Sequence, residues 1–393
     1  MTIVPLFLLT LGAINWGYAY PLVFLFVALL RQRMLGREIY FNFLYAPGFW
    51  LLLSAGMTYA LIGMRTISGV YHHGILPVVA FAIGWLIAEG SSDKQIRDGI
   101  LALAAGFGTY ATLNMLVNIG NNRYRLIDFW TGTYRAATGS GALNTLPISV
   151  TPYAVKFEKR LPVKILFLAL FFATIQYMFM LGTRFAILLL IVILAALQFA
   201  YSEHGIAGIL KCLGIMVVIS LIAFLFYHFN VLSIRDYILS TNLAARYERR
   251  ASLENSDSFR FQSFWIGLRE LIQYPMGGRA SQIYRHNMWL DVGRVSGIIP
   301  FCLLLIYSIK NFANVTVIWK NPKILPSLRY LLLFLYIGAY VNCFVEPIWE
   351  GALNFFLALC VVDGMVSAMM RRLENDPNSE ESVPDASNLH ADL

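Results

Sequence analysis

The chain has 393 residues, of which 58% are hydrophobic and only 13% are charged, and its formal net charge is +8. Soluble domains carry roughly 25% charged residues because polar surface must cover their core, so this composition excludes a cytosolic enzyme, a disordered chain and a small secreted disulfide scaffold. The basic residues are scattered through loops between apolar runs, which also excludes nucleic acid as a partner. The sequence instead predicts an all-α fold, a polytopic bundle of transmembrane helices.

Eleven apolar runs are candidates for membrane spans, which need roughly 20 residues each. They cover residues 3–30, 44–64, 74–88, 99–118, 139–154, 163–182, 185–201, 206–228, 289–309, 328–345 and 350–369. The first run carries Asn15-Trp16-Gly17 near its middle, so it could be two short segments, which would give twelve spans. The run 139–154 is short and rich in Gly, Ser, Thr and Pro.

The lysines divide the connecting loops into two sets. The eight lysines are Lys94, Lys156, Lys159, Lys164, Lys211, Lys310, Lys320 and Lys323, and all fall in or beside alternate loops. Short loops rich in Lys and Arg stay in the cytoplasm, so these loops are predicted to be cytoplasmic. The opposite loops contain arginine without lysine and are predicted to lie outside.

One long loop, from about 230 to 288, falls on the outer side and contains eight arginines and five acidic residues. The planar guanidinium fork binds phosphate and diphosphate oxygens in pairs, although ordinary surface and headgroup contacts explain most outer arginines equally well. At the other end, the acidic tail 373–393 is predicted to be disordered in the cytoplasm. The transmembrane domain is therefore predicted to cover residues 1–372.

Three features of the outer side stand out. Gly182-Thr183-Arg184 places a charge between two apolar runs, where charges are costly and often functional; a snorkelling arginine is the alternative. A helix is predicted to start near Asp257 and to end at Tyr274-Pro275-Met276-Gly277-Gly278. It carries Arg260 near its start, where free backbone N–H groups favour an anion. Apolar residues recur along it at helical spacing, which predicts an amphipathic helix resting on the outer membrane surface.

The third feature is the segment Arg285-His286-Asn287 with Asp291 shortly after it, just before an apolar run. Histidine is a proton acceptor near neutral pH, and a structural histidine is the alternative. Asn287 and Asp291 are candidates for orienting the histidine or a substrate, or else for capping the helix that follows. Glu346 and Glu350 bracket Pro347 near the outer end of a later run, where they contact a sugar or form a solvated turn.

No nucleotide-binding loop, zinc-protease motif or serine-hydrolase motif is present. The four cysteines lie in apolar runs without a CxxC pair, and the adjacent His72 and His73 do not form a metal site because neighbouring side chains point in different directions. We therefore predict that the protein uses no metal and no cofactor, and that its substrate reaches the membrane already activated.

Together the three outer features resemble the bacterial O-antigen polymerase and O-antigen ligase superfamily. The resemblance rests on an outer arginine between two spans, a long outer loop with an arginine-aromatic helix ending in Pro-x-Gly-Gly, and His286-Asn287 followed by nine residues and then Gly297. Pro300 stands where a second glycine is often expected, which weakens the ligase-specific match more than the superfamily match. The resemblance extends in topology over roughly residues 128–370.

The resemblance implies a metal-independent inverting glycosyltransferase of the bacterial inner membrane, with its site facing the periplasm or the cell exterior. The donor would be an undecaprenyl-diphosphate-linked oligosaccharide, and the acceptor a sugar hydroxyl of a glycan or of lipid A-core. By the same resemblance, Arg184 and Arg260 would bind the donor diphosphate and His286 would act at the reacting centre.

Several functions remain open at this stage. A polymerase of O-antigen, capsular or exopolysaccharide repeat units is the leading hypothesis, and a ligase that moves glycan onto lipid A-core shares its donor and site. A regulator of chain length is a further candidate partner, beside the membrane lipid itself. A transporter or flippase for lipid-linked glycans is the alternative of a different class; it would need polar residues near the membrane midplane and broken helices.

Overall fold

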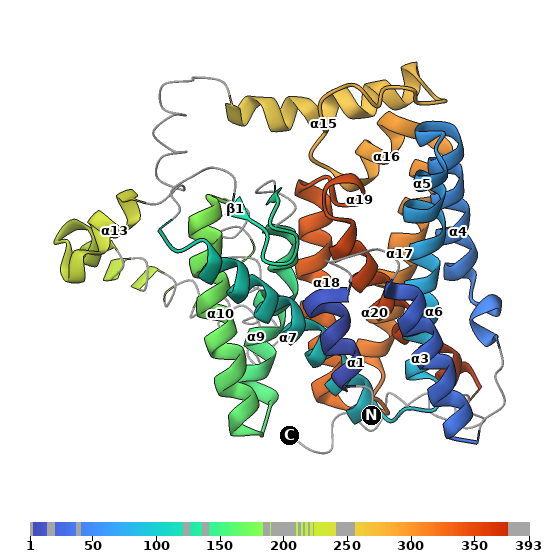
Figure 1. The fold of residues 1–393 in the computed structure, drawn as a ribbon, viewed down its shortest axis with the longest axis horizontal. Coiled ribbons are helices and arrows are strands. Elements are labelled where there is room, and N and C mark those ends of the chain that lie inside the picture. The colour runs from blue at the N-terminus through green and yellow to red at the C-terminus, as the bar shows by residue number, and fades with distance from the viewer. Residues whose placement is uncertain are drawn as a thin grey trace.

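The protein is seen here in a computed structural model that describes residues 3–13, 20–36, 41–120, 126–135, 141–183, 189, 210, 214, 217–218, 221–222, 224–240 and 256–375. These residues form a bundle of helices (Figure 1). Within them, two short strands, β1 (Leu126–Ile127) and β2 (Tyr134–Arg135), pair in antiparallel fashion. The predicted all-α class is therefore confirmed for the part of the chain that the structure describes.

Seven helical segments of the described chain are long and apolar enough to cross a membrane. They are Pro47–Met64, Ile67–Ala88, Asp93–Val117, Leu161–Leu181, Ile298–Lys320, Pro326–Val345 and Leu353–Glu374. The first joins α4 (Pro47–Thr58) to the π-helix η3 (Tyr59–Met64), and the second joins α5 (Ile67–Gly69), the π-helix η4 (Val70–Ile75) and α6 (Leu76–Ala88). The other five are α7, α10, α17, α18 and α20 in that order. These helices support a multi-pass membrane protein.

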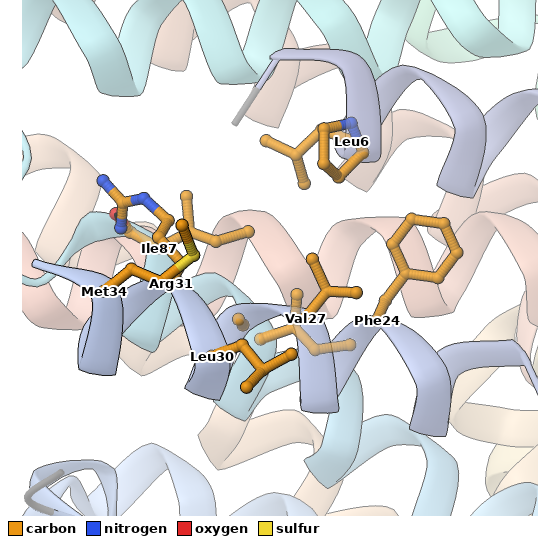
Figure 2. A pocket seen from close by; sticks show the side chains of 10 residues that line it. Leu6, Phe24, Val27, Leu30, Arg31, Met34 and Ile87 are labelled. Carbon is orange, nitrogen blue, oxygen red and sulfur yellow. Dashed lines mark hydrogen bonds between the residues drawn. The ribbon is translucent and has the colours of Figure 1, made fainter. Parts of the chain in front are cut away.

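The described parts of the first apolar run are helical. The run contains α1 (Ile3–Leu8), the π-helix η1 (Leu9–Ala13) and, after residues 14–19, α3 (Tyr20–Met34). An apolar pocket of about 280 Å³ lies between α1, α3 and α6. Leu6 lies opposite Val27 in this pocket (Figure 2). Arg31 lies at one end of this pocket but donates to Ile87 O (3.3 Å) and Ser91 Oγ (3.1 Å), so its charge is already engaged.

The predicted span 289–309 is wrong at its start, because the helix is interrupted at Gly297. The break separates α16 (Met288–Ser296) from α17 (Ile298–Lys320). Gly297 has a φ of +91°, and a Cβ atom there would lie 2.1 Å from Pro275 O. Only glycine combines this backbone conformation with such a close approach, so the membrane-crossing helix begins after it.

Other predicted runs differ in length or lie outside the described residues. The run 139–154 corresponds to α9 (Thr145–Phe157), whose 13 residues are too few for an ordinary span. The runs 185–201 and 206–228 fall almost entirely outside the described residues. α20 extends into the predicted tail as far as Glu374, and residues 376–393 lie outside the description.

The lysine-bearing loops come together at one end of the bundle. Asp93 Oδ2 accepts from Leu325 N (2.9 Å), and Asp93 Oδ1 pairs with Arg372 (2.5 Å). Arg160 in turn pairs with Asp98 Oδ1 at 2.8 Å. These contacts join the start of α7 (Asp93–Val117) to the α9–α10 and α17–α18 connections and to the end of α20.

The opposite end of the bundle is covered by α15 (Ser256–Gln273), which lies across the helix ends above α16 (Figure 1). Between them and the bundle lies α19 (Ile348–Gly351), which connects α18 (Pro326–Val345) to α20 (Leu353–Glu374). The remaining described elements are α10 (Leu161–Leu181), η2 (Asn42–Tyr45), η5 (Val231–Ser233) and α13 (Ile234–Ser240).

Candidate functional site

α15 is held on α16 by a face of small and polar residues. Ser263, Gly267, Glu270 and Leu271 are buried at helical spacing, and a Cβ atom on Gly267 would lie 3.1 Å from Leu290 Cδ1. Most of the aromatic and aliphatic stripe predicted from the sequence lies outside this buried face. Trp265 and Ile272 are exposed, and of the described side chains of the stripe only Leu271 is buried.

Neither of the two arginines predicted to bind diphosphate has a described side chain. Arg184 lies outside the described residues, and Arg260 belongs to α15 but only its backbone is described. Their joint role in binding diphosphate therefore stays a prediction.

The glycine-containing turn Pro275–Gly278, after α15, directly contacts the turn at Gly297, after α16. Gly278 N donates to Val295 O (2.9 Å) and Ile298 N donates to Pro275 O (2.8 Å). Gly277 has a φ of +73°, and a Cβ atom there would lie 2.5 Å from Gly297 N. The Pro-x-Gly-Gly turn after α15 and the glycine after α16 thus form one backbone junction. This junction fixes the C-terminal ends of α15 and α16 next to each other.

His286 sits immediately before α16 with an unusual backbone conformation. Its φ of +53° lies in the left-handed region, which non-glycine residues rarely adopt and which clusters at functional sites. Asp291 Oδ1 accepts from Arg285 N at 2.8 Å. Asn287 caps α16 by accepting from Leu290 N (3.0 Å) and donates to Phe344 O (3.2 Å). Asn287 and Asp291 therefore hold the backbone on both sides of His286 rather than its ring.

The imidazole ring of His286 faces a carboxylate. Its Nδ1 lies 3.7 Å from Glu346 Oε2, at the end of α18. The Glu346 side chain is only 9% exposed, whereas that of His286 is 25% exposed. Because Nδ1 itself is buried, the exposed part of the ring is carried by its other atoms. A histidine with one nitrogen toward a buried carboxylate and another edge open is suited to proton transfer.

A buried ion pair fixes the residue before His286. Arg285 donates from Nε (2.9 Å) and from a terminal nitrogen (2.7 Å) to the two oxygens of Glu270 on α15. Each side chain is 8% exposed, and Arg279 lies 3.5 Å from the same carboxylate. This paired, two-point contact attaches the His286 segment to α15.

A second network joins α16 to α19 and to η3. Arg294 donates to both oxygens of Glu350 (3.1 and 2.9 Å) and to Asp291 Oδ1 (3.2 Å). Its remaining nitrogen donates to the backbone carbonyls of Arg279, Ala280 and Gln282. Tyr59 in turn donates its hydroxyl to Glu350 at 3.1 Å. Arg285 and Arg294 are thus occupied by protein partners and are not available for a diphosphate.

Burial changes the acidity of the two carboxyl groups in this network. Burial raises the pKa of Glu350 to about 7, with Asp291 adding to the increase and Arg294 opposing it. Burial also raises the pKa of Asp291, against the opposing backbone hydrogen bond from Arg285 and the charge of Arg294.

The raised pKa of Glu350 predicts that the folded protein loses stability as pH increases. The folded state retains the Glu350 proton up to about pH 7, whereas the unfolded chain loses it near the ordinary pKa of 4.5. The contribution of this proton to folding stability is therefore complete below pH 4.5 and is lost as pH rises through 7. We expect the detergent-solubilised protein to unfold at a lower temperature at pH 8 than at pH 6. Glu350→Gln should reduce that difference, while exposed Glu374→Gln should not; an unchanged difference in Glu350→Gln would contradict the assignment.

The carboxylates of this site were the part least apparent from sequence. Glu346 and Glu350 do not form a solvated turn: Glu346 is 7% exposed and Glu350 is ion-paired. Their spacing about Pro347 at the end of an apolar run was the available signal. Glu270 gave no such signal, because in the sequence it is one of several charged and polar residues of the long outer segment.

The two adjacent histidines point in different directions, as predicted. His73 is buried, with its ring 4.9 Å from the ring of Tyr59 and stacked on that of Trp349 at 5.7 Å. His72 contacts Ser68 Oγ at 3.2 Å instead. Among the described residues no group of three His, Cys, Asp or Glu side chains is placed to hold a metal ion.

Comparison with models of known protein families and with curated proteins finds no match to this chain.

Proposed function

We propose that the protein is a membrane glycosyltransferase that moves an undecaprenyl-diphosphate-linked glycan onto an acceptor sugar hydroxyl. The observation that carries the proposal is the surroundings of His286: one ring nitrogen faces buried Glu346, and the segment is locked by the junction of Gly277 and Gly297. Two of the segments that gave the sequence resemblance, Pro275–Gly278 and His286–Gly297, are therefore neighbours in space.

In the proposed reaction His286 acts as the general base. The acceptor hydroxyl oxygen attacks the anomeric carbon of the donor from the face opposite the diphosphate, and its proton passes to the imidazole. The bond between the anomeric carbon and the phosphate oxygen breaks, and its electron pair leaves with the lipid diphosphate. The carboxylate of Glu346, 3.7 Å from Nδ1 and beyond hydrogen-bond distance, stabilises by its charge the imidazolium that forms.

Guanidinium groups supply the stabilisation of the leaving diphosphate in this proposal. Developing negative charge on a diphosphate is stabilised well by the paired donors of arginine. Arg285 and Arg294 are already engaged with carboxylates, and the family resemblance implies Arg184 and Arg260 as the diphosphate ligands.

The proposed site faces the periplasm or the cell exterior of the bacterial inner membrane. His286 lies at the end of the bundle covered by α15 (Figure 1), and Asp93, Asp98 and the lysine-bearing loops lie at the other end. The positive-inside rule assigns the lysine-rich end to the cytoplasm.

Arg260→Lys should strongly reduce polymer formation while leaving the amount of protein unchanged. Lysine keeps the positive charge but loses the paired donors of the planar fork. Arg269→Lys on the exposed side of the same helix is the matched control and should be tolerated. Polymer lengths and amounts are compared on gels from cells with equal protein levels. Full activity of Arg260→Lys would remove this residue from diphosphate binding.

Polymerase and ligase are distinguished by reconstitution. Purified protein in liposomes is given lipid-linked repeat units, with and without lipid A-core. A ladder of glycan lengths without core supports a polymerase, which we propose as the activity. Glycan attached to core without a ladder identifies a ligase instead.

A transporter of lipid-linked glycans is favoured by one observation, a buried acid inside a candidate span. Asp363 of α20 accepts from Tyr307 (2.5 Å) and from the Tyr336 hydroxyl. Intramembrane acids often mark transport pathways. Both of its oxygens already accept hydrogen bonds from protein hydroxyls, however, so this acid is satisfied within the bundle.

A further inference from the structure

At the lysine-rich end of the bundle, far from His286, lies a polar pocket of about 230 Å³. It is formed where the start of α4, the end of α6, the middle of α17 and the end of α20 meet. Its lining residues are Tyr45, Ala46, Pro47, Gly48, Trp85, Lys310, Asn314, Ser367, Met370, Arg371, Glu374 and Asn375. We propose that this pocket binds the phosphate headgroup of an anionic phospholipid.

Two basic side chains give the pocket its preference for an anion. Lys310 makes no ion pair or hydrogen bond within the described chain. Arg371 donates to Asn42 O at 3.3 Å, and its guanidinium carbon lies 5.6 Å from the ring centre of Tyr45. Neither has a carboxylate partner among the described residues, and exposed Glu374 pairs with neither of them. A basic pocket between helices on the cytoplasmic side is a recurrent site for anionic lipid headgroups.

A third donor in the pocket is buried without an acceptor. Trp85 is 2% exposed, and its indole N–H makes no hydrogen bond within the described residues. A buried donor without a partner is costly. A phosphate oxygen in this pocket would accept from Trp85 together with the charges of Lys310 and Arg371.

An exposed aromatic residue of the pocket favours a lipid over a water-soluble phosphate. Tyr45, which lines the pocket, is 78% exposed. Trp and Tyr concentrate at the level of lipid headgroups, so this wall of the pocket is placed where a phospholipid can present its phosphate. The lipid's acyl chains would then extend along the apolar outer surface of the bundle.

Native mass spectrometry of the purified full chain tests the proposal with phosphatidylglycerol, phosphatidylcholine and inorganic phosphate as separate probes. We expect phosphatidylglycerol to be retained in preference to phosphatidylcholine and not to be displaced by millimolar phosphate. Lys310→Gln should weaken its retention about fivefold, the typical contribution of one basic residue at an anionic surface. Trp85→Phe should also weaken it, because the ring is kept and the donor lost.

Lys320→Gln and Trp50→Phe are the matched controls, since each removes the same group at the same end of the bundle but outside the pocket. The unfolding temperature without added lipid confirms that each variant is folded. Equal retention of phosphatidylglycerol by wild type and Lys310→Gln would overturn the proposal. So would equal retention of phosphatidylcholine, or displacement by inorganic phosphate, which would identify a water-soluble ligand.

Discussion

Replacing His286 by alanine should abolish visible polymer while the protein accumulates to its normal level. A general base contributes typically 10²–10⁴-fold to a rate, and the ring of His286 is a quarter exposed, so its loss leaves no large cavity. Polymer is measured on gels from cells with matched protein amounts.

His72→Ala is the matched control for this experiment, because it removes the same ring from a residue whose Nδ1 contacts Ser68 Oγ (3.2 Å), and its polymer should be normal. His73 does not serve as a control, since its buried ring packs on Tyr59 and Trp349. Glu346→Gln should lower the rate less than His286→Ala, since it removes only the negative charge that faces the ring. Wild-type polymer from a well-expressed His286→Ala protein would eliminate the residue from catalysis.

The second large effect is expected on stability, when one partner of the Arg285–Glu270 pair is removed. Arg285→Met leaves a buried carboxylate without its two-point partner, and such losses cost about 3–5 kcal/mol. The unfolding temperature in detergent should therefore fall sharply. The double variant Glu270→Met/Arg285→Met should recover most of the loss, because apolar side chains replace a buried ion pair at little cost.

The exposed residue Arg269 provides the control for this cycle. Arg269→Met changes the same charge on the same helix and should leave the unfolding temperature nearly unchanged. Additive losses in the double variant would show that Arg285 and Glu270 act independently, in conflict with the 2.7 and 2.9 Å contacts between them.

The sequence predicted the apolar helices better than it predicted their breaks. Hydropathy over about twenty residues reports burial in lipid, so seven predicted runs correspond to the seven candidate spans. It does not report where a helix stops inside an apolar run. Gly297 divides 289–309 because Pro275 O approaches it from a distant turn, and no local pattern contains that contact. The choice between eleven and twelve spans rested on the first run, whose residues 14–19 lie outside the described chain, as do nearly all of residues 185–228.

The sequence singled out the histidine, Asp291, Glu346 and Glu350 of the candidate site, but it did not predict Glu270 or which residues the glutamates contact. His286, Asn287 and Asp291 are adjacent along the chain, and the glycine spacing singles them out. The partners of this segment, Glu270, Glu346 and Glu350, come from other elements and meet it only in the folded bundle. The sequence also does not show which arginines are free to bind a diphosphate. Arg285 and Arg294 are paired with carboxylates in the structure, and nothing in their sequence surroundings indicates this pairing.

The most direct measurement asks whether the purified protein makes a glycosidic bond or only moves its substrate. Liposomes containing the protein are supplied with isotopically labelled undecaprenyl-diphosphate-linked repeat units, and free undecaprenyl diphosphate and glycan length are followed together by mass spectrometry. We predict release of one lipid diphosphate for each new glycosidic bond, and none with His286→Ala. Labelled glycan that changes leaflet while remaining on its original lipid would contradict the proposed transferase and identify a transporter.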